Sequence, residues 1–250
     1  MIPDLLDKGA AVSMECAERL VGLFARSFEG TDVHAAPYEV AERGEREYDF
    51  QCSFPSLGRF LRPTLEAFRR DGGYLVADPE RRDFWQKRLA GLSGRPKVGI
   101  IWRGQLMDQG RSKFYATIKD LAPILTLPGV DFVNLMYDEC DDEIAEALEL
   151  YGVPIHTWDD LDLKDDLDGV AALISGLDLA GCCLSTPGEL AGALGVPTLT
   201  FLAQKSHFMM LGTADTAWHP SARYFTKELR DPWGPVFEDL AQSVKQRLGL

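Results

Sequence analysis

Five consecutive residues, Ser185-Thr186-Pro187-Gly188-Glu189, have the composition of a helix start that can bind phosphate. Serine and threonine are common N-cap residues, and proline is favoured in the first helical turn. Such a start presents free backbone N–H groups and the positive end of the helix dipole to an anion. Because the same composition also serves simply to cap a helix, the segment predicts either a phosphate site or an ordinary helix start.

Further candidate residues directly follow apolar runs or lie a few positions beyond them. Arg111 offers a planar guanidinium that can neutralise a phosphate oxygen, although a lone arginine is more often solvated. Trp158 offers a flat face to a base or a sugar ring, and the alternative is a half-buried core aromatic. Arg103-Gly104 and Tyr137-Asp138 occupy equivalent places after two other apolar runs.

Metal and nucleophile motifs do not occur in the sequence. The four histidines have no HExxH or paired spacing, so we expect no zinc site: His34, His156, His207 and His219. Two acidic runs, 159–162 and 165–168, resemble a metal-binding cluster, but such runs more often form a solvated face or cap the next helix. The sequence has no G-x-S-x-G, P-loop or G-x-G-x-x-G pattern, which excludes common hydrolases, P-loop NTPases and standard dinucleotide enzymes.

The candidate residues lie within a regular alternation of expected strands and helices. The expected strands are Lys97–Trp102, Val130–Met136, Val153–His156, Leu179–Leu184 and Thr198–Leu202. The expected helices are Ile118–Leu125, Asp141–Leu150, Asp168–Gly176, Gly188–Leu194 and Pro235–Leu248. The pattern predicts five parallel strands in a Rossmann-like α/β layer. Because ligands bind at the carboxyl ends of such strands, we expect the candidate residues to share one edge of the sheet.

The first 90 residues are less regular and predict a partial α/β layer. Here we expect strands at 11–14 and 48–52, a helix at 17–28 and a loop at 39–47. A helix that begins after Asp78-Pro79 should bridge the two halves of the chain. Glycine, serine and proline cluster near Gly91–Pro96, so we place a domain boundary there.

Composition limits the class of protein. The chain has 250 residues, 46% apolar and 26% charged, which is typical of a globular protein. Its net charge of −13 disfavours nucleic acid and anionic membranes as partners. The five cysteines form no CxxC pair and predict reduced thiols, with the adjacent Cys182 and Cys183 in the core. The sequence shows no signal peptide and no apolar stretch of 18 residues, so we expect a cytoplasmic protein without a membrane span.

Several segments together resemble a known family, the glycosyltransferase region that follows tetratricopeptide repeats in many bacterial proteins. That region is similar to the ADP-heptose:lipopolysaccharide heptosyltransferases. The resemblance covers about Lys97 to Leu250, and the stretch Leu190-Ala-Gly-Ala-Leu-Gly-Val-Pro197 is its most specific part. Its other segments in this half are Val98–Gly104, Arg111-Ser112, His156–Asp162, Asp168–Ile174, Leu177–Leu179 and Trp218–Ser221. Upstream, a weaker fit involves Met14–Cys16, Tyr48-Asp49, Ser56-Leu57 and Tyr74–Pro79.

The resemblance implies a GT-B architecture, in which two Rossmann-like domains face each other across a cleft. Residues 1–92 would form a partial N-terminal domain on the acceptor side, and residues 93–250 would bind the nucleotide-sugar donor, without a metal or another cofactor. Arg103, Gly104 and Arg111 would lie by the donor phosphates, and Tyr137 and Trp158 by the base. The diphosphate end of a helix would consist of Ser185, Thr186, Gly188 and Glu189.

The chain departs from the family pattern in two places. Where the family commonly has an Asp-Thr start and a histidine, this chain has Leu184-Ser185 and Glu189, and an ionised Glu189 would repel a diphosphate. The family's first strand and the loop with its proposed catalytic aspartate would precede Ile2, so the catalytic base is not assigned.

These departures leave several functions open. The first is a glycosyltransferase that transfers a sugar from a nucleotide diphosphate to an unknown acceptor. The second is a catalytically inactive, glycosyltransferase-like binding or interaction module. A third possibility is a chain whose first sheet is completed by another chain or a second copy, which predicts an exposed strand edge in that sheet.

Overall fold

The computed structural model describes residues 1–36, 48–70, 72–105 and 110–250. Its N-terminal part is a small α/β unit, in which β1 and β2 pair in parallel with Val12 opposite Thr31. The elements of this part are α1 (Ile2–Asp7), β1 (Val12–Cys16), α2 (Val21–Ser27), β2 (Thr31–Ala35) and α3 (Phe54–Leu61). Two 3-10 turns, Glu18–Leu20 and Leu65–Ala67, complete it.

A six-stranded parallel sheet forms the centre of the C-terminal part, with the strand order β5-β4-β3-β6-β7-β8. Its strands are β3 (Lys97–Ile101), β4 (Asp131–Asn134), β5 (Ile155–His156), β6 (Leu179–Cys183), β7 (Thr198–Leu202) and β8 (Ala222–Thr226). Every residue of β3, β6 and β7 is buried. This explains why these strands are nearly continuous apolar runs in the sequence, since helices cover both faces of a parallel sheet.

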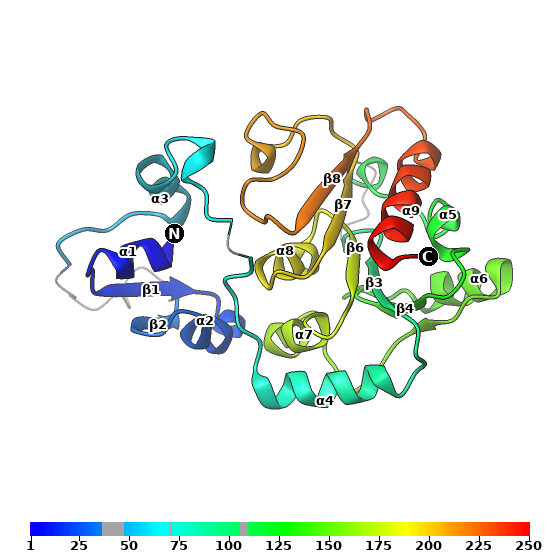
Figure 1. Ribbon diagram of the computed structural model, residues 1–250, viewed down its shortest axis with the longest axis horizontal. Coiled ribbons are helices and arrows are strands. Elements are labelled where there is room, and N and C mark those ends of the chain that lie inside the picture. The colour runs from blue at the N-terminus through cyan, green and yellow to red at the C-terminus, as the bar shows by residue number, and fades with distance from the viewer. Residues whose placement is uncertain (37–47, 71, 106–109) are drawn as a thin grey trace.

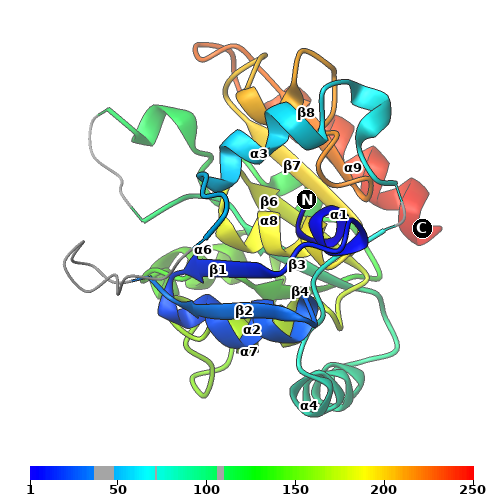
Figure 2. The ribbon, with the colours of Figure 1, turned by 90° about the vertical axis from the view of Figure 1, so that its left-hand side faces the viewer.

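Helices form a layer on each face of this sheet, as Figure 1 shows. On the face toward the N-terminal part lie α4 (Pro79–Ala90), α7 (Leu167–Ile174) and α8 (Thr186–Ala193). On the other face lie α5 (Ala122–Leu125), α6 (Asp141–Tyr151) and α9 (Gly234–Leu248). The N-terminal part packs beside α7 and α8, in front of the sheet in the view of Figure 2. No helix of the described residues is long and apolar enough to cross a membrane.

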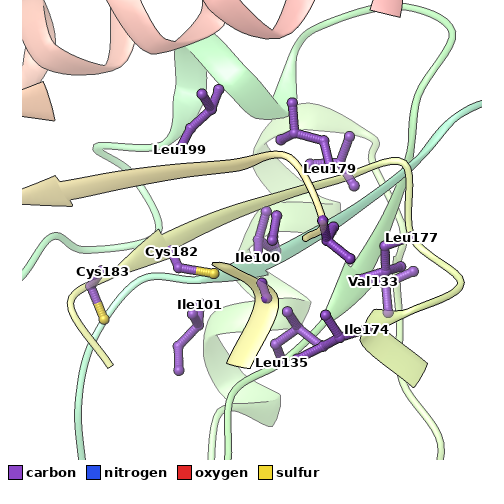
Figure 3. Packing of buried hydrophobic residues seen from close by; sticks show 14 of the residues in the cluster. Ile100, Ile101, Val133, Leu135, Ile174, Leu177, Leu179, Cys182, Cys183 and Leu199 are labelled. Atoms are coloured by element: carbon purple, nitrogen blue, oxygen red, sulfur yellow. The ribbon is translucent and has the colours of Figure 1, made fainter. Parts of the chain in front are cut away.

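Side chains from both parts meet in one continuous core. Ile2 and Leu23 of the N-terminal part belong to the same buried cluster as the central strands. Within the C-terminal sheet, residues of β3, β4 and β6 pack against Ile174 and Leu177, as Figure 3 shows. Cys182 and Cys183 are 0% and 2% exposed, which confirms that they are core residues.

Two of the expected elements differ from the structure, and two strands of the structure were not expected. The chain forms six parallel C-terminal strands and not five, because Ala222–Thr226 adds the edge strand β8. Residues 48–52 form no strand, and Phe50 is 94% exposed, so this segment has no buried face. The second N-terminal strand is β2 at Thr31–Ala35. The expected helix 118–125 is α-helical only from Ala122, because proline at the second helical position cannot supply the N–H that a longer helix needs.

The remaining elements agree with their predicted type. The helix expected at 17–28 is present as a 3-10 turn followed by α2, and α4 begins at Pro79 with Asp78 as its cap. Gly152 ends α6 in the left-handed conformation, with φ of 66°, which glycine adopts without a steric penalty. The loop expected at 39–47 lies outside the described residues, and the domain boundary near Gly91–Pro96 stays a prediction.

The two acidic runs are held by arginines from the first 90 residues of the chain. Arg88 donates to Asp160 at 2.6 and 2.8 Å, and Arg19 lies 3.3 Å from Asp165. Arg81 and Arg26 bind the next two carboxylates along the run, Asp166 and Asp168. Asp166 also caps α7 by accepting a hydrogen bond from the Gly169 N–H at 3.0 Å, as expected for an acidic run before a helix. These four arginine–aspartate pairs, here called the arginine clamp, join α4 and the segment 19–26 to the residues before and within α7.

Candidate functional site

The strand order places a natural binding position between β3 and β6. From β3 the chain builds outward to β4 and β5, and it then crosses back to place β6 on the other side of β3. At such a reversal the loops after the two central strands diverge and leave a crevice at their carboxyl ends. Arg103 and Gly104 follow β3, and Ser185 follows β6. The sequence therefore brings these three predicted residues to the place where an open α/β sheet binds its ligand.

The first turn of α8 keeps its N–H groups free of a side-chain cap. Ser185 is extended, and its hydroxyl donates to the Cys183 carbonyl at 2.9 Å, so it does not cap the helix. No other described side chain caps α8. A Cβ on Gly188 would lie 3.0 Å from the Cys182 Cβ, so glycine lets this turn pack closely on β6. Pro187 has no N–H, and the Glu189 N–H donates to the Ser185 carbonyl at 3.0 Å, so the N–H groups of Thr186 and Gly188 are those available to an anion.

Arg103 is held by acidic groups of α6 and the loop before it. Its guanidinium donates to Glu143 at 2.6 and 2.8 Å, to Asp138 at 3.0 Å and to the Glu139 carbonyl at 2.6 Å. Glu143 also accepts a hydrogen bond from the indole of Trp102 at 2.8 Å. The side chain of Arg103 is only 11% exposed, so this network fixes its orientation. A ligand phosphate would have to share Arg103 with these carboxylates.

Gly104 makes room for Tyr115, and Arg111 lies near that tyrosine. A Cβ on Gly104 would come within 2.5 Å of the Tyr115 hydroxyl oxygen. Burial raises the pKa of Tyr115, whereas the nearby positive charge of Arg111 lowers it. Arg111 is exposed and precedes the 3-10 turn Ser112–Phe114. Residues 106–109 of the loop between Gly104 and Arg111 lie outside the described part of the chain.

A hollow of about 370 Å³ lies beyond the carboxyl ends of β4 and β5. Tyr137 and Trp158 both line it, as do several acidic residues and Lys164. Trp158 is half-buried and packs edge-on against Trp85, with 5.1 Å between ring centroids, and the Arg88 guanidinium lies 5.3 Å from its ring. Trp158 is thus packed against α4, as the core alternative predicts, and it still borders the hollow. Burial raises the pKa of Tyr137 above its usual value.

The carboxylate of Glu189 contacts His219. One carboxylate oxygen lies 2.9 Å from His219 Nε2. The His219 side chain is 5% exposed, whereas that of Glu189 is 37% exposed. The histidine ring packs over Gly192, where a Cβ would lie 2.6 Å from His219 Cγ.

The predicted residues fall into three neighbouring groups. Arg103, Gly104 and Arg111 follow β3, and the group formed by Ser185, Thr186, Gly188 and Glu189 begins α8. Tyr137 and Trp158 border the hollow beyond the neighbouring strands β4 and β5. Sequence reasoning missed the partners Glu143 and His219. Both are 30 to 40 residues from the groups they bind, and no local pattern marks them.

Comparison with known sequences gives one curated relative, and no family model matches the chain. Protein FlbA of Caulobacter vibrioides (strain ATCC 19089 / CIP 103742 / CB 15) is 34% identical over 261 residues. The alignment covers 98% of this chain and 43% of FlbA, so the chain spans less than half the length of that relative. The name of FlbA states no activity.

The solved structures that match this chain include the following three. A glycosyl transferase family 9 protein from Veillonella parvula DSM 2008 has a TM-score of 0.51 and 14% identity, with 71% of this chain and 54% of that chain covered. Escherichia coli ADP-heptose lps heptosyltransferase II has a TM-score of 0.46 and 17% identity, with 69% of this chain and 54% of that chain covered. E. coli heptosyltransferase WaaC with ADP has a TM-score of 0.47 and 13% identity, with 94% of this chain and 72% of that chain covered. The chain is therefore an α/β protein with parallel sheets and a glycosyltransferase fold of the GT-B type.

Proposed function

We propose that the protein is a heptosyltransferase-like glycosyltransferase that takes a sugar from a nucleotide-diphosphate donor and transfers it to an unknown acceptor. The observation that carries this proposal is the uncapped first turn of α8 at the strand-order reversal of a glycosyltransferase fold. A diphosphate placed there would accept hydrogen bonds from the N–H groups of Thr186 and Gly188.

The hollow beyond β4 and β5 suits the base of such a donor. It lies on the same edge of the sheet as α8, with only the end of β3 between them. Trp158 and Tyr137 supply aromatic surface, on which a base can stack. The acidic groups of its rim suit hydrogen-bond donors such as ribose hydroxyls or amino groups of a base, and they disfavour a phosphate.

The proposed chemistry is electrostatic. As the bond between sugar and diphosphate breaks, negative charge grows on the leaving phosphate, and the amides of α8 and Arg111 would stabilise it. A base has to accept the proton of the acceptor hydroxyl, and no described residue is assigned to this role.

A binding and turnover assay tests the proposal. Calorimetry with ADP, UDP and GDP should show one site, and the matching nucleotide sugar should then release its diphosphate when incubated with the protein. We expect Arg111→Ala to lower the transfer rate about 100-fold, with the fold unchanged by circular dichroism. Lys113→Ala, in the 3-10 turn that follows Arg111, is the matched control. Full activity of Arg111→Ala would contradict the role of Arg111.

A second candidate is a binding module that holds the nucleotide and has no turnover. Two observations favour it: Glu189 places a carboxylate in the first turn of α8, and Arg103 is already engaged by Glu143 and Asp138. Nucleotide binding without sugar release would support this candidate, whereas turnover would eliminate it. The association with tetratricopeptide repeats stays a prediction under either function.

A further inference from the structure

Glu189 creates an electrostatic problem at the proposed diphosphate site. It is the fourth residue of α8 and lies in the same first turn as the N–H groups proposed to bind the diphosphate. A carboxylate in the first turn interacts favourably with these N–H groups itself and repels a second anion. A helix start that binds diphosphate therefore needs this charge to be offset or directed elsewhere.

His219 lies where it can offset the charge of Glu189 and also direct the carboxylate away from the first turn. The carboxylate of Glu189 reaches His219 Nε2 at 2.9 Å, and the histidine ring packs over Gly192, one helical turn further along α8. The hydrogen bond thus draws the carboxylate along the helix, away from the first N–H groups. When Nε2 carries the proton, it donates to the carboxylate and delocalises its charge.

The histidine ring is held in place from both sides. On one side Gly192 has no side chain, and a Cβ would overlap the ring at 2.6 to 3.0 Å. The ring of Tyr74 stacks on His219 at 6.0 Å between centroids with an interplanar angle of 19°. The backbone N–H of Tyr74 donates to the Ala193 carbonyl at 2.7 Å, which anchors the tyrosine to the end of α8. His219 Nδ1 is buried and has no hydrogen-bond partner among the described residues.

We propose that His219 is a positioning residue that holds the Glu189 carboxylate away from the first turn of α8, so that this turn can bind a nucleoside diphosphate. The inference rests on the proposed function, and it adds a requirement that the function alone does not contain. The histidine acts through Glu189, so its importance depends on the charge at that position.

A double-mutant cycle tests this dependence. ADP, UDP and GDP are titrated by calorimetry into the wild type, His219→Gln, Glu189→Gln and the double variant. We expect His219→Gln to weaken binding at least tenfold, because the carboxylate is released toward the N–H groups. Glu189→Gln should bind as tightly as the wild type or more tightly. In the double variant the affinity should return to within about threefold of Glu189→Gln, since no charge is left to position.

His207→Gln is the matched control. Burial lowers the pKa of His207, and the negative charge of Glu189 partly opposes this, but His207 is not hydrogen-bonded to that carboxylate. We expect its affinity to stay within about twofold of the wild type. If His219→Gln does not fold, Glu189→Gln decides alone, and a loss of affinity above tenfold in that variant overturns the inference.

The outcomes separate this inference from the proposed function. A wild type that binds none of the three nucleotides overturns the proposed function and this inference with it. A wild type that binds, with His219→Gln unchanged, overturns only the role of His219. If His219→Gln binds weakly and the double variant binds equally weakly, the role of His219 is merely structural. That outcome also overturns the inference.

Discussion

Gly192 shows how a single missing side chain sets the position of a polar pair. Because a Cβ at this position would overlap the ring of buried His219, we expect Gly192→Ala to destabilise the protein by about 1–3 kcal/mol. Urea unfolding measures this change. Gly234→Ala is the control, since nothing lies within 4 Å of its Cβ and its φ is not left-handed, and its effect should stay within about 0.5 kcal/mol. Equal effects would show that the close contact with His219 is not the cause.

Asp4 is expected to make stability depend on pH in the acid range. Two hydrogen bonds from Arg62, at 2.7 and 2.9 Å, lower the pKa of Asp4 from 3.8 to about 2. Because the folded-state pKa is the lower one, this stabilisation is complete above about pH 4 and is lost as the pH falls toward 2.

At pH 7 the free energy of unfolding of Asp4→Asn should therefore be lower than that of the wild type by roughly 2 kcal/mol. This difference should shrink at pH 3. Urea titrations at both pH values measure it. Asp7→Asn serves as the control, because Asp7 is 73% exposed in its pair with Arg69. A difference for Asp4→Asn that does not change with pH would refute the assignment.

For single residues, the sequence predicted local conformation better than it predicted which distant residues would be in contact. The start of α8 at Ser185–Gly188 was predictable, because serine, proline and glycine have local conformational preferences that act whatever the rest of the fold does. The pairing of Glu189 with His219 was not predictable, since it depends on the packing of two segments 30 residues apart. The same holds for Arg103, whose partner Glu143 comes from α6.

Among the elements, α7 depends on a cap that another helix holds in place. Asp166 accepts from the Gly169 N–H, and Arg81 of α4 binds the same carboxylate with two hydrogen bonds. We expect Arg81→Ala to lower the free energy of unfolding by about 1 kcal/mol. The loss is small because the side chains of Arg81 and Asp166 are both about one-third exposed, and solvent screens the pair. The cost should decrease in 1 M NaCl.

The matched variant for this prediction is Arg82→Ala on the next position of α4. Arg82 pairs with exposed Asp83, and its removal should change the free energy of unfolding by less than about 0.5 kcal/mol. Thermal unfolding at two salt concentrations measures both variants. A loss in Arg81→Ala that salt does not reduce would point to packing and not to charge.

The elements that the sequence predicted are those with a long apolar signal. β3, β6 and β7 are buried on both faces and are therefore continuous apolar runs. β8 is an edge strand with Arg223 exposed, so its alternation is short and weak. β2 likewise contains Asp32 and His34, and only its pairing with β1 reveals it as a strand.

For the whole molecule, two pairs of the arginine clamp, Arg19–Asp165 and Arg26–Asp168, link the N-terminal part to the C-terminal part. We expect the double variant Arg19→Gln/Arg26→Gln to increase amide hydrogen exchange in β1 and β2 by roughly tenfold, because local opening of this part becomes easier. Exchange in β3 and β6 should not change, since those strands are buried in the central sheet. Mass spectrometry measures both regions, and uniform acceleration in all strands would contradict a local role for the clamp.

The small N-terminal sheet bears on the question of partners. Within the described residues, β1 and β2 pair only with each other, so each has an unpaired edge, as the third sequence hypothesis requires. Self-association stays a prediction, and light scattering tests it: a strict monomer at all concentrations would count against it. The partial domain of residues 1–92 and the donor domain of residues 93–250 also stay predictions.

The adjacent thiols of β6 give the molecule a built-in reporter of its own opening. Burial raises the pKa of Cys183 to about 12, and Cys182 is fully covered, so neither sulfur reacts with an alkylating reagent while the central sheet is closed. Cys52 is exposed and should react at once. The delay between labelling of Cys52 and labelling of Cys182 and Cys183 therefore measures how often the innermost strands become accessible, without any engineered probe.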